Sequence, residues 1–194
     1  MKKDSIQENL VIASLIFLAI ICRLATNKLE LWNFNAIGAS ALFGGIVIKN
    51  KRLAYLLPLL TLFITDVFFQ LFTSIQGFYG GQMFFVYGAF LLITFIGTHI
   101  KKTNPVNLVL AAIGTGVLFF LLTNLGVWML STLYPHTAQG LVACYAAAIP
   151  FYKNDLFGSF ALNTVLGNVF FTGVLFGVWA LIKQTALQSD KQLA

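Results

Sequence analysis

Long apolar runs separated by short polar breaks make up nearly the whole chain. A helix needs roughly 20 mainly apolar residues to cross the hydrocarbon core of a bilayer. Six runs approach or exceed that length, whereas the apolar run at 137–149 is too short to cross. We therefore expect a bundle of six transmembrane helices, with a short re-entrant or interfacial helix before the last span. The expected spans are residues 10–24, 33–48, 53–73, 82–98, 105–133 and 156–182.

The composition excludes a soluble protein. Hydrophobic residues make up 59% of the chain, charged residues make up 9%, and the mean hydropathy is +0.87. Soluble domains carry about 25% charged residues, and a water-exposed surface without them would present large apolar patches that aggregate. Because no polar segment of domain size lies between the runs, we expect residues 1–194 to form a single all-α domain embedded in a lipid bilayer.

The basic residues indicate how the expected helices are oriented. In a six-span arrangement nine of the 12 lysines and arginines fall on one side, and Arg23, Lys28 and Lys153 fall on the other. Basic residues accumulate on the cytoplasmic side of a membrane. We therefore expect both termini to be cytoplasmic and the chain to lie in a bacterial inner membrane. The net charge of +6 then reflects topology, and no nucleic-acid partner is expected.

Polar side chains gather at one depth of the expected bundle. At 1.5 Å per residue, Asp66, Asn124 and Asn163 all lie roughly 12 Å below the outer surface. Such side chains are costly in hydrocarbon unless they find a partner or water. Either they line a cavity that is open to the outside, or they join helices by hydrogen bonds. The candidate ligand-binding residues on this side are Arg23, Asn33, Asn35, Asp66, Gln82, Asn124, Trp128 and Asn163.

Asp66 is the most demanding of these residues, because a lone carboxylate at that depth must become protonated or pair with a cation. Arg23 is the one strong cation of the outer side within plausible reach in the sequence. The residues leave two interpretations open. Asp66 either forms a structural pair with Arg23, or it contacts a ligand or carries a proton.

Known catalytic and metal-binding motifs are missing from the chain. It contains no phosphate-binding P-loop, no GxSxG nucleophile turn and no HExxH zinc motif. Cys22 and Cys144 are far apart in the sequence, and His99 and His136 fall at opposite faces of the expected bundle. We therefore expect no catalytic residue, no metal site, no cofactor and no enzymatic activity.

Several short motifs together resemble a family of bacterial membrane proteins that is labelled as transport proteins. That family is similar in turn to the substrate-binding S components of energy-coupling factor (ECF) vitamin transporters. The motifs are Trp32-Asn33-Phe34-Asn35-Ala36 leading into Ala41-Leu42-Phe43-Gly44-Gly45, Asp66, Phe119-Phe120 with Thr123-Asn124 and Trp128, and Cys144-Tyr145 leading to Ile149-Pro150-Phe151.

The resemblance implies a six-helix, S-component-like bundle whose outward-facing pocket takes a vitamin-sized small molecule. A corrinoid is one candidate ligand. It also implies an ECF-type coupling subunit and ATPases as partners. The first span departs from the family's pattern here, because Ala13 and Ala19 lack the alanine-x-x-x-alanine spacing of the docking face; the series Ala36, Ser40, Gly44 is an alternative face.

The sequence therefore predicts a membrane transport protein, either a substrate-binding subunit or a solitary transporter, that captures a small molecule from the outer side. Two other functions stay open. One is an assembly subunit that binds another membrane protein through small-residue faces such as Gly173 and Gly177. The other is an intramembrane enzyme that acts on a lipid through Asp66 and Arg23.

Overall fold

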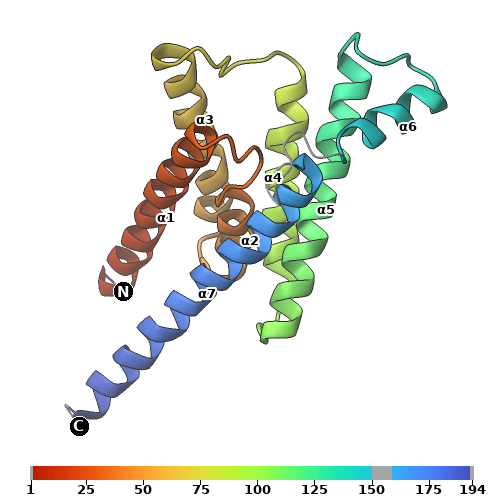
Figure 1. Ribbon diagram of the computed structural model, residues 1–194. Coiled ribbons are helices and arrows are strands. Elements are labelled where there is room, and N and C mark those ends of the chain that lie inside the picture. The colour runs from red at the N-terminus through yellow and green to blue at the C-terminus, as the bar shows by residue number, and fades with distance from the viewer. Residues whose placement is uncertain (1, 150–158, 193–194) are drawn as a thin grey trace.

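The computed structural model describes the backbone of residues 2–149 and 159–192, and the side chains of residues 10, 12–149 and 159–184. All the regular structure in these ranges is helical, in seven helices (Figure 1). The helices are α1 (Lys2–Lys28), α2 (Ile37–Val47), α3 (Lys51–Phe72), α4 (Gln82–His99), α5 (Pro105–Leu130), α6 (Ala138–Ala147) and α7 (Phe160–Gln192).

The lengths and compositions of the helices are those of a membrane protein. Within the described residues, α3, α4, α5 and the part of α7 from residue 160 to residue 184 are each long and apolar enough to cross a bilayer. The all-α prediction is therefore confirmed for the described residues. The prediction of six spans stays a prediction, because α2 has only 11 residues.

Helix α2 is shorter than the apolar run that suggested it. The run covers residues 33–48, but the helix begins at Ile37, after a connection of residues 29–36 that is not helical. Asn33 has a φ of 65°, and the side-chain oxygen of Asn35 accepts a hydrogen bond from the backbone N–H of Ile37 at 3.0 Å. Asparagine side chains compete in this way with the helical backbone. An average of hydropathy along the sequence does not detect that competition.

Helix α2 lies in the centre of the bundle, where it contacts α1, α3, α4, α5 and α7. Residues 37–45 of the helix are all buried. The small residues expected to form a contact face are used inside the molecule. A Cβ atom on Gly45 would lie 2.3 Å from the carbonyl oxygen of Thr94 in α4, and one on Gly97 would lie 2.6 Å from the carbonyl oxygen of Leu42. Backbone therefore packs directly on backbone between α2 and α4.

The ends of the helices follow their polar residues. Asn50 caps α3 by accepting a hydrogen bond from the N–H of Arg52 at 3.1 Å, and Asn104 caps α5 by accepting one from Asn107 at 2.8 Å. Pro105 takes the first position of α5, where the expected span of residues 105–133 also begins. Thr137 caps the short helix α6. The expected start of the last span at residues 154–156 and the basic residue Lys153 lie outside the described residues.

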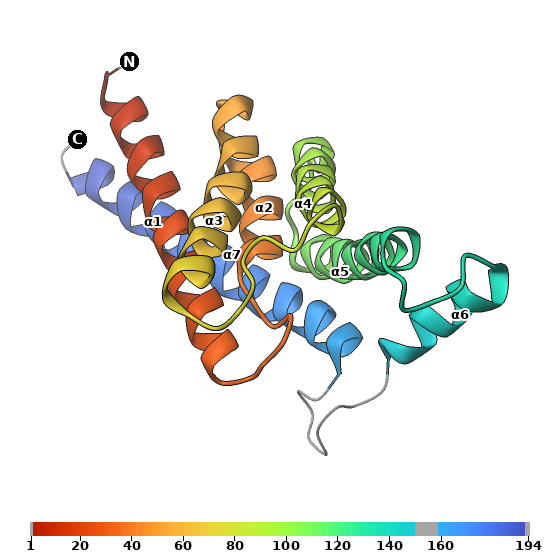
Figure 2. The same cartoon turned by 90° about the horizontal axis from the view of Figure 1, so that it is seen from above.

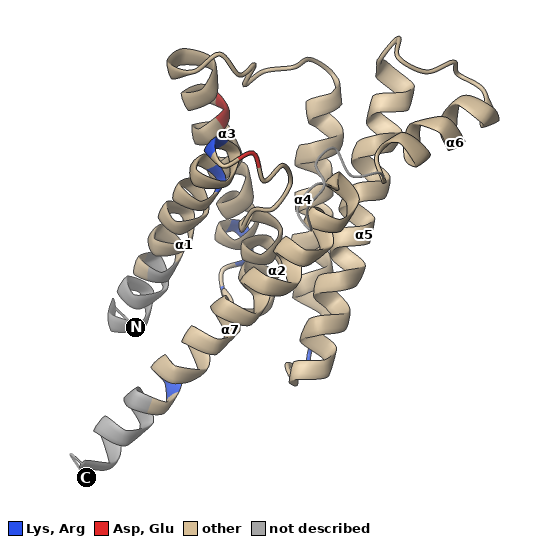
Figure 3. Ribbon diagram, viewed as in Figure 1, with Lys and Arg blue, Asp and Glu red and all other residues tan. Residues whose placement is uncertain are grey.

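Both ends of the chain lie at the same end of the bundle. In Figure 1 the start of α1 and the end of α7 lie low in the view, and Figure 2 shows them near each other when the molecule is seen from above. Figure 3 shows basic residues at the link from α4 to α5 and near the end of α7, while α1 carries a further basic group at the opposite end. The connections from α1 to α2 and from α3 to α4, together with α6, lie toward that opposite end.

Candidate functional site

A cavity of about 570 Å³ opens at the end of the bundle where α1 and α3 end and α4 and α7 begin. Its walls come from all seven helices and from the connections between them. The lining residues are Arg23, Thr26, Asn27, Leu31, Trp32, Asn33, Asn35, Ile37, Leu62, Tyr79, Val86, Phe90, Phe119, Thr123, Asn124, Val127, Leu133, Tyr134, Cys144, Ala147, Ala148 and Phe160.

The connection of residues 29–36 forms one wall of this cavity. It turns sharply at Glu30 and Asn33, which both have positive φ angles (57° and 65°). The N–H of Leu31 bonds to the carbonyl of Thr26 at 2.8 Å, and the side-chain N–H of Asn163 in α7 bonds to the carbonyl of Trp32 at 2.8 Å. Irregular backbone is tolerated at membrane depth where its polar groups are satisfied or line a cavity.

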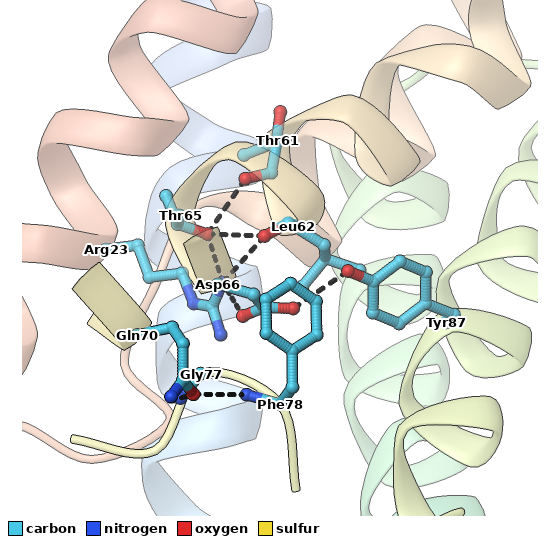
Figure 4. A network of polar contacts seen from close by, with 9 residues as sticks. All are labelled: Arg23, Thr61, Leu62, Thr65, Asp66, Gln70, Gly77, Phe78 and Tyr87. Carbon is cyan, nitrogen blue, oxygen red and sulfur yellow. Dashed lines mark hydrogen bonds and ion pairs between the residues drawn. The ribbon is translucent and has the colours of Figure 1, made fainter. Parts of the chain in front are cut away.

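Arg23 forms a second wall and is held by a network of polar contacts that Figure 4 shows from close by. Its Nη1 atom lies 2.7 Å from Oδ1 of Asp66. The same nitrogen donates to the carbonyl of Leu62 at 3.4 Å and to the hydroxyl of Thr65. The guanidinium also stands over the ring of Phe69, 5.3 Å from its centroid. These contacts fix the guanidinium at the edge of the cavity.

Asp66 lies behind Arg23 and is 1% exposed. Its second oxygen, Oδ2, accepts a hydrogen bond from the hydroxyl of Tyr87 in α4 at 2.8 Å. Both carboxylate oxygens thus have partners, as a buried charge requires. Of the two interpretations that the sequence left open, the structure has the pair with Arg23, and Asp66 is not among the residues that line the cavity.

The structure brings four of the eight predicted site residues to the cavity wall, namely Arg23, Asn33, Asn35 and Asn124. The other four lie near the same end without lining the cavity. Asp66 supports Arg23, and Asn163, fully buried, supports the connection of residues 29–36. Trp128 donates from Nε1 to the carbonyl of Pro135 at 3.0 Å, and Gln82 is the first residue of α4.

Sequence reasoning missed part of the lining. Thr26 and Asn27 line the cavity from the last turn of α1, whereas the first expected span, residues 10–24, ended before them. Phe90 and Phe119 carry no polar signal, and their rings pack with centroids 4.8 Å apart between α4 and α5. Aromatic residues in an apolar helix cannot be assigned to a cavity or to the lipid face without knowing how the helices pack.

Tyr79 reaches the cavity from the connection between α3 and α4. The backbone N–H groups of Gly77 and Phe78 donate to Oε1 of Gln70, at 3.2 Å and 3.4 Å, which holds this connection on the end of α3. Burial, followed by the nearby charge of Asp66, raises the pKa of Tyr79 to about 12, and the charge of Arg23 acts in the opposite direction. Its phenol is therefore a neutral hydrogen-bond donor at physiological pH.

The cavity therefore combines one cation with neutral amides, hydroxyls and an aromatic wall. Within the described residues no aspartate or glutamate lines it, and no group of three histidine, cysteine or acidic side chains could hold a metal ion. The arrangement offers shape and hydrogen bonds to a small molecule.

Comparison with known proteins identifies a family. A family model described as "Family of unknown function (DUF6580)" matches residues 3–191. No curated protein and no solved structure matches the chain. The resemblance to S components of vitamin transporters therefore stays a prediction.

Proposed function

The chain belongs to a family of unknown function (DUF6580), and we propose that it is a membrane transport protein that captures a small molecule from the outer side of the membrane. The observation that carries this proposal is the cavity of about 570 Å³ at one end of an apolar helical bundle. Ligand sites are concave, mostly apolar and furnished with a few converging polar groups, with typical volumes of about 300–1,000 Å³.

The origin of the polar groups favours a binding cavity over hydrogen bonds that merely join helices. Arg23, Asn33 and Asn124 come from α1, from the connection of residues 29–36 and from α5. None of the hydrogen bonds that the structure shows joins these three side chains to one another. The side chain of Asn124 bonds to the carbonyl of Phe120 in its own helix at 2.8 Å. Polar side chains that converge on a space without bonding across it are arranged for a ligand.

The interruption before α2 supports the same proposal. Transporter binding sites commonly lie where a membrane helix is broken, because the broken backbone can line a cavity. Here residues 31–33 and 35 of the connection line the cavity, and α2 extends for 11 residues, about 16 Å. In the proposed six-span arrangement α1, α2, α3, α4, α5 and α7 form the bundle, and α2 with its preceding connection serves as the second span.

The proposed orientation follows from the basic residues. With the termini and the link from α4 to α5 in the cytoplasm of a bacterial cell, the cavity opens on the outer side of the inner membrane. An S-component-like subunit would deliver a vitamin-sized molecule, a corrinoid among the candidates, with the help of a coupling subunit and ATPases. Ala36, Ser40 and Gly44 are buried against other helices, so the face that would contact such a coupling subunit lies elsewhere.

Native mass spectrometry of the protein, extracted gently from its own membrane, tests the proposal. We expect a co-purifying small molecule that is lost in Asn124→Ala, whose side chain lines the cavity. Asn107→Ala is the matched control, because Asn107 lies in the first turn of the same helix at the far end and should leave the ligand in place.

Two other results would replace the proposal. An apo mass with a stoichiometric protein partner would identify an assembly subunit. Turnover of a lipid by the purified protein alone would identify an intramembrane enzyme.

A further inference from the structure

The contacts of Arg23 are unevenly distributed over its guanidinium. Within the described residues, the ion pair with Asp66 and the hydrogen bonds to Leu62 and Thr65 all use Nη1 (Figure 4). Among the residues that the structure describes, none makes such a contact with the edge formed by Nε and Nη2. That edge presents two parallel N–H donors in a fixed fork, which matches the two oxygens of a carboxylate.

We infer that the ligand of this cavity carries a carboxylate that binds side-on to Nε and Nη2 of Arg23. This inference rests on the proposed function, because it names the chemical class of the molecule that the cavity would capture. In this arrangement Asp66 is a positioning residue, since it contacts Arg23 and not the ligand. It holds the guanidinium by one nitrogen and leaves the fork free.

The charges around the cavity support an anionic group over a cationic one. Among the lining residues that the structure describes, Arg23 is the only charged side chain of the lysine, arginine, aspartate and glutamate types. A ligand cation would therefore meet no carboxylate at the wall. A ligand carboxylate at the free fork would lie next to the guanidinium and on the far side of it from Asp66. Because Coulomb energy falls with distance, the attraction exceeds the repulsion.

The remaining lining residues indicate which molecule would fit beside the carboxylate. Phe90 and Phe119 form a pair of rings on one wall, and Leu62 and Val86 extend it with aliphatic surface. Phe90 is 4% exposed, so most of its ring packs against neighbouring residues and only a small part reaches the cavity. The matching molecule is a compact organic acid with an aromatic or aliphatic body. Its polar edge would meet the amides of Asn35 and Asn124.

Three probes of similar size separate the possible charges of the ligand. Benzoate, benzamide and benzylamine share a ring and carry an anionic, a neutral and a cationic group. Their binding to the full chain in lipid nanodiscs is measured at millimolar concentration by ligand-detected NMR. We expect benzoate to bind at least about tenfold more tightly than the other two. Equal or tighter binding of benzamide or benzylamine would overturn the inference.

Arg23→Lys keeps the positive charge beside Asp66 but removes the fork. We expect it to abolish most of the preference for benzoate over benzamide, whereas Arg52→Lys, an exposed change at the other end of α3, should leave the preference intact. A preference that survives in Arg23→Lys would refute the side-on contact.

A measurement on the unmodified protein does not depend on the folding of a variant. Benzoate binding should weaken when the pH falls through the pKa of benzoic acid, because only the ionised form fills the fork, and constant binding would contradict the inference. Palmitate carries the same carboxylate on a lipid chain. If the protein binds palmitate but not benzoate, a compact ligand is excluded. A small molecule without an acid group, found by native mass spectrometry, would refute this inference and leave the proposed function in place.

Discussion

Neutralising the ion pair between Arg23 and Asp66 tests how the cavity wall is held together. Asp66→Asn and Arg23→Gln each replace a charged group by a neutral amide; asparagine has the size of aspartate, whereas glutamine is shorter than arginine. The charge that remains is then buried without its partner, because the side chain of Asp66 is 2% exposed and that of Arg23 is 18% exposed. The double variant removes both charges and leaves two amides that can hydrogen-bond.

The size of the effect follows from the geometry. Two unit charges about 4 Å apart attract each other by about 4 kcal/mol at an effective dielectric constant of about 20. Breaking a buried pair by removing one partner typically costs about 3–5 kcal/mol. Because Arg23 keeps some contact with solvent, we expect each single variant to lose about 3 kcal/mol of unfolding free energy. The double variant should lose about 2 kcal/mol less than the sum of the two.

Thermal unfolding in mild detergent measures these losses. For a chain of this length, about 3 kcal/mol corresponds to a fall in Tm of about 6–12 °C. Thr65→Val, which removes a hydroxyl that accepts from Arg23, is a milder control and should cost about 1 kcal/mol. Single variants within about 0.5 kcal/mol of wild type, or losses that simply add, would refute the coupling of this pair.

Three further predictions concern packing and protonation. Gly45→Ala should lower Tm strongly, because its new Cβ would meet a backbone carbonyl at 2.3 Å. Gly173→Ala should leave Tm unchanged, because nothing lies within 4 Å of its Cβ. Equal shifts in Tm would contradict the central place of α2. The pKa of Tyr79 is raised to about 12 from an ordinary value of 10, so the unfolded chain loses the phenolic proton first. Wild type should therefore lose stability relative to Tyr79→Phe as the pH rises from about 10 to about 12, and a gain would refute the assignment. Gly77→Ala would place a Cβ atom 1.8 Å from the carbonyl oxygen of Asp66, so it should displace the connection and move the pKa of Tyr79 back toward 10 in an ultraviolet titration against Tyr79→Phe.

Hydrophobic runs were sufficient to predict most of the helices. The boundaries at Asn50 and Asn104 follow from side chains that accept hydrogen bonds from the next turn, which is a local property that sequence can show. The short helix α6 was predicted at residues 137–149 and extends from Ala138 to Ala147. The start of α2 was predicted four residues too early, because a hydrophobic average does not detect the turn at Asn33.

The candidate site was predictable only in part. Arg23 was the one strong cation within reach of Asp66 on the same expected side, so the sequence pointed to them as neighbours, and they are in contact. It could not show which of them faces the cavity, because that depends on the rotation of α1 and α3 about their axes. Tyr87, which completes the contacts of Asp66, gave no signal, since a tyrosine in an apolar run is equally typical of a membrane interface.

Because α2 is enclosed by its neighbours, the chain cannot finish folding until α7 has been made. An 11-residue segment is too short to be held across a bilayer by lipid, so its place depends on the helices that surround it. One of these, α7, follows the other six helices in the chain and therefore leaves the ribosome after them. Its Gly167 lies against residues 34 and 35, and its first residue, Phe160, lines the cavity. A nascent chain that ends before α7 would therefore hold the earlier apolar segments in the membrane while the binding cavity is still unformed.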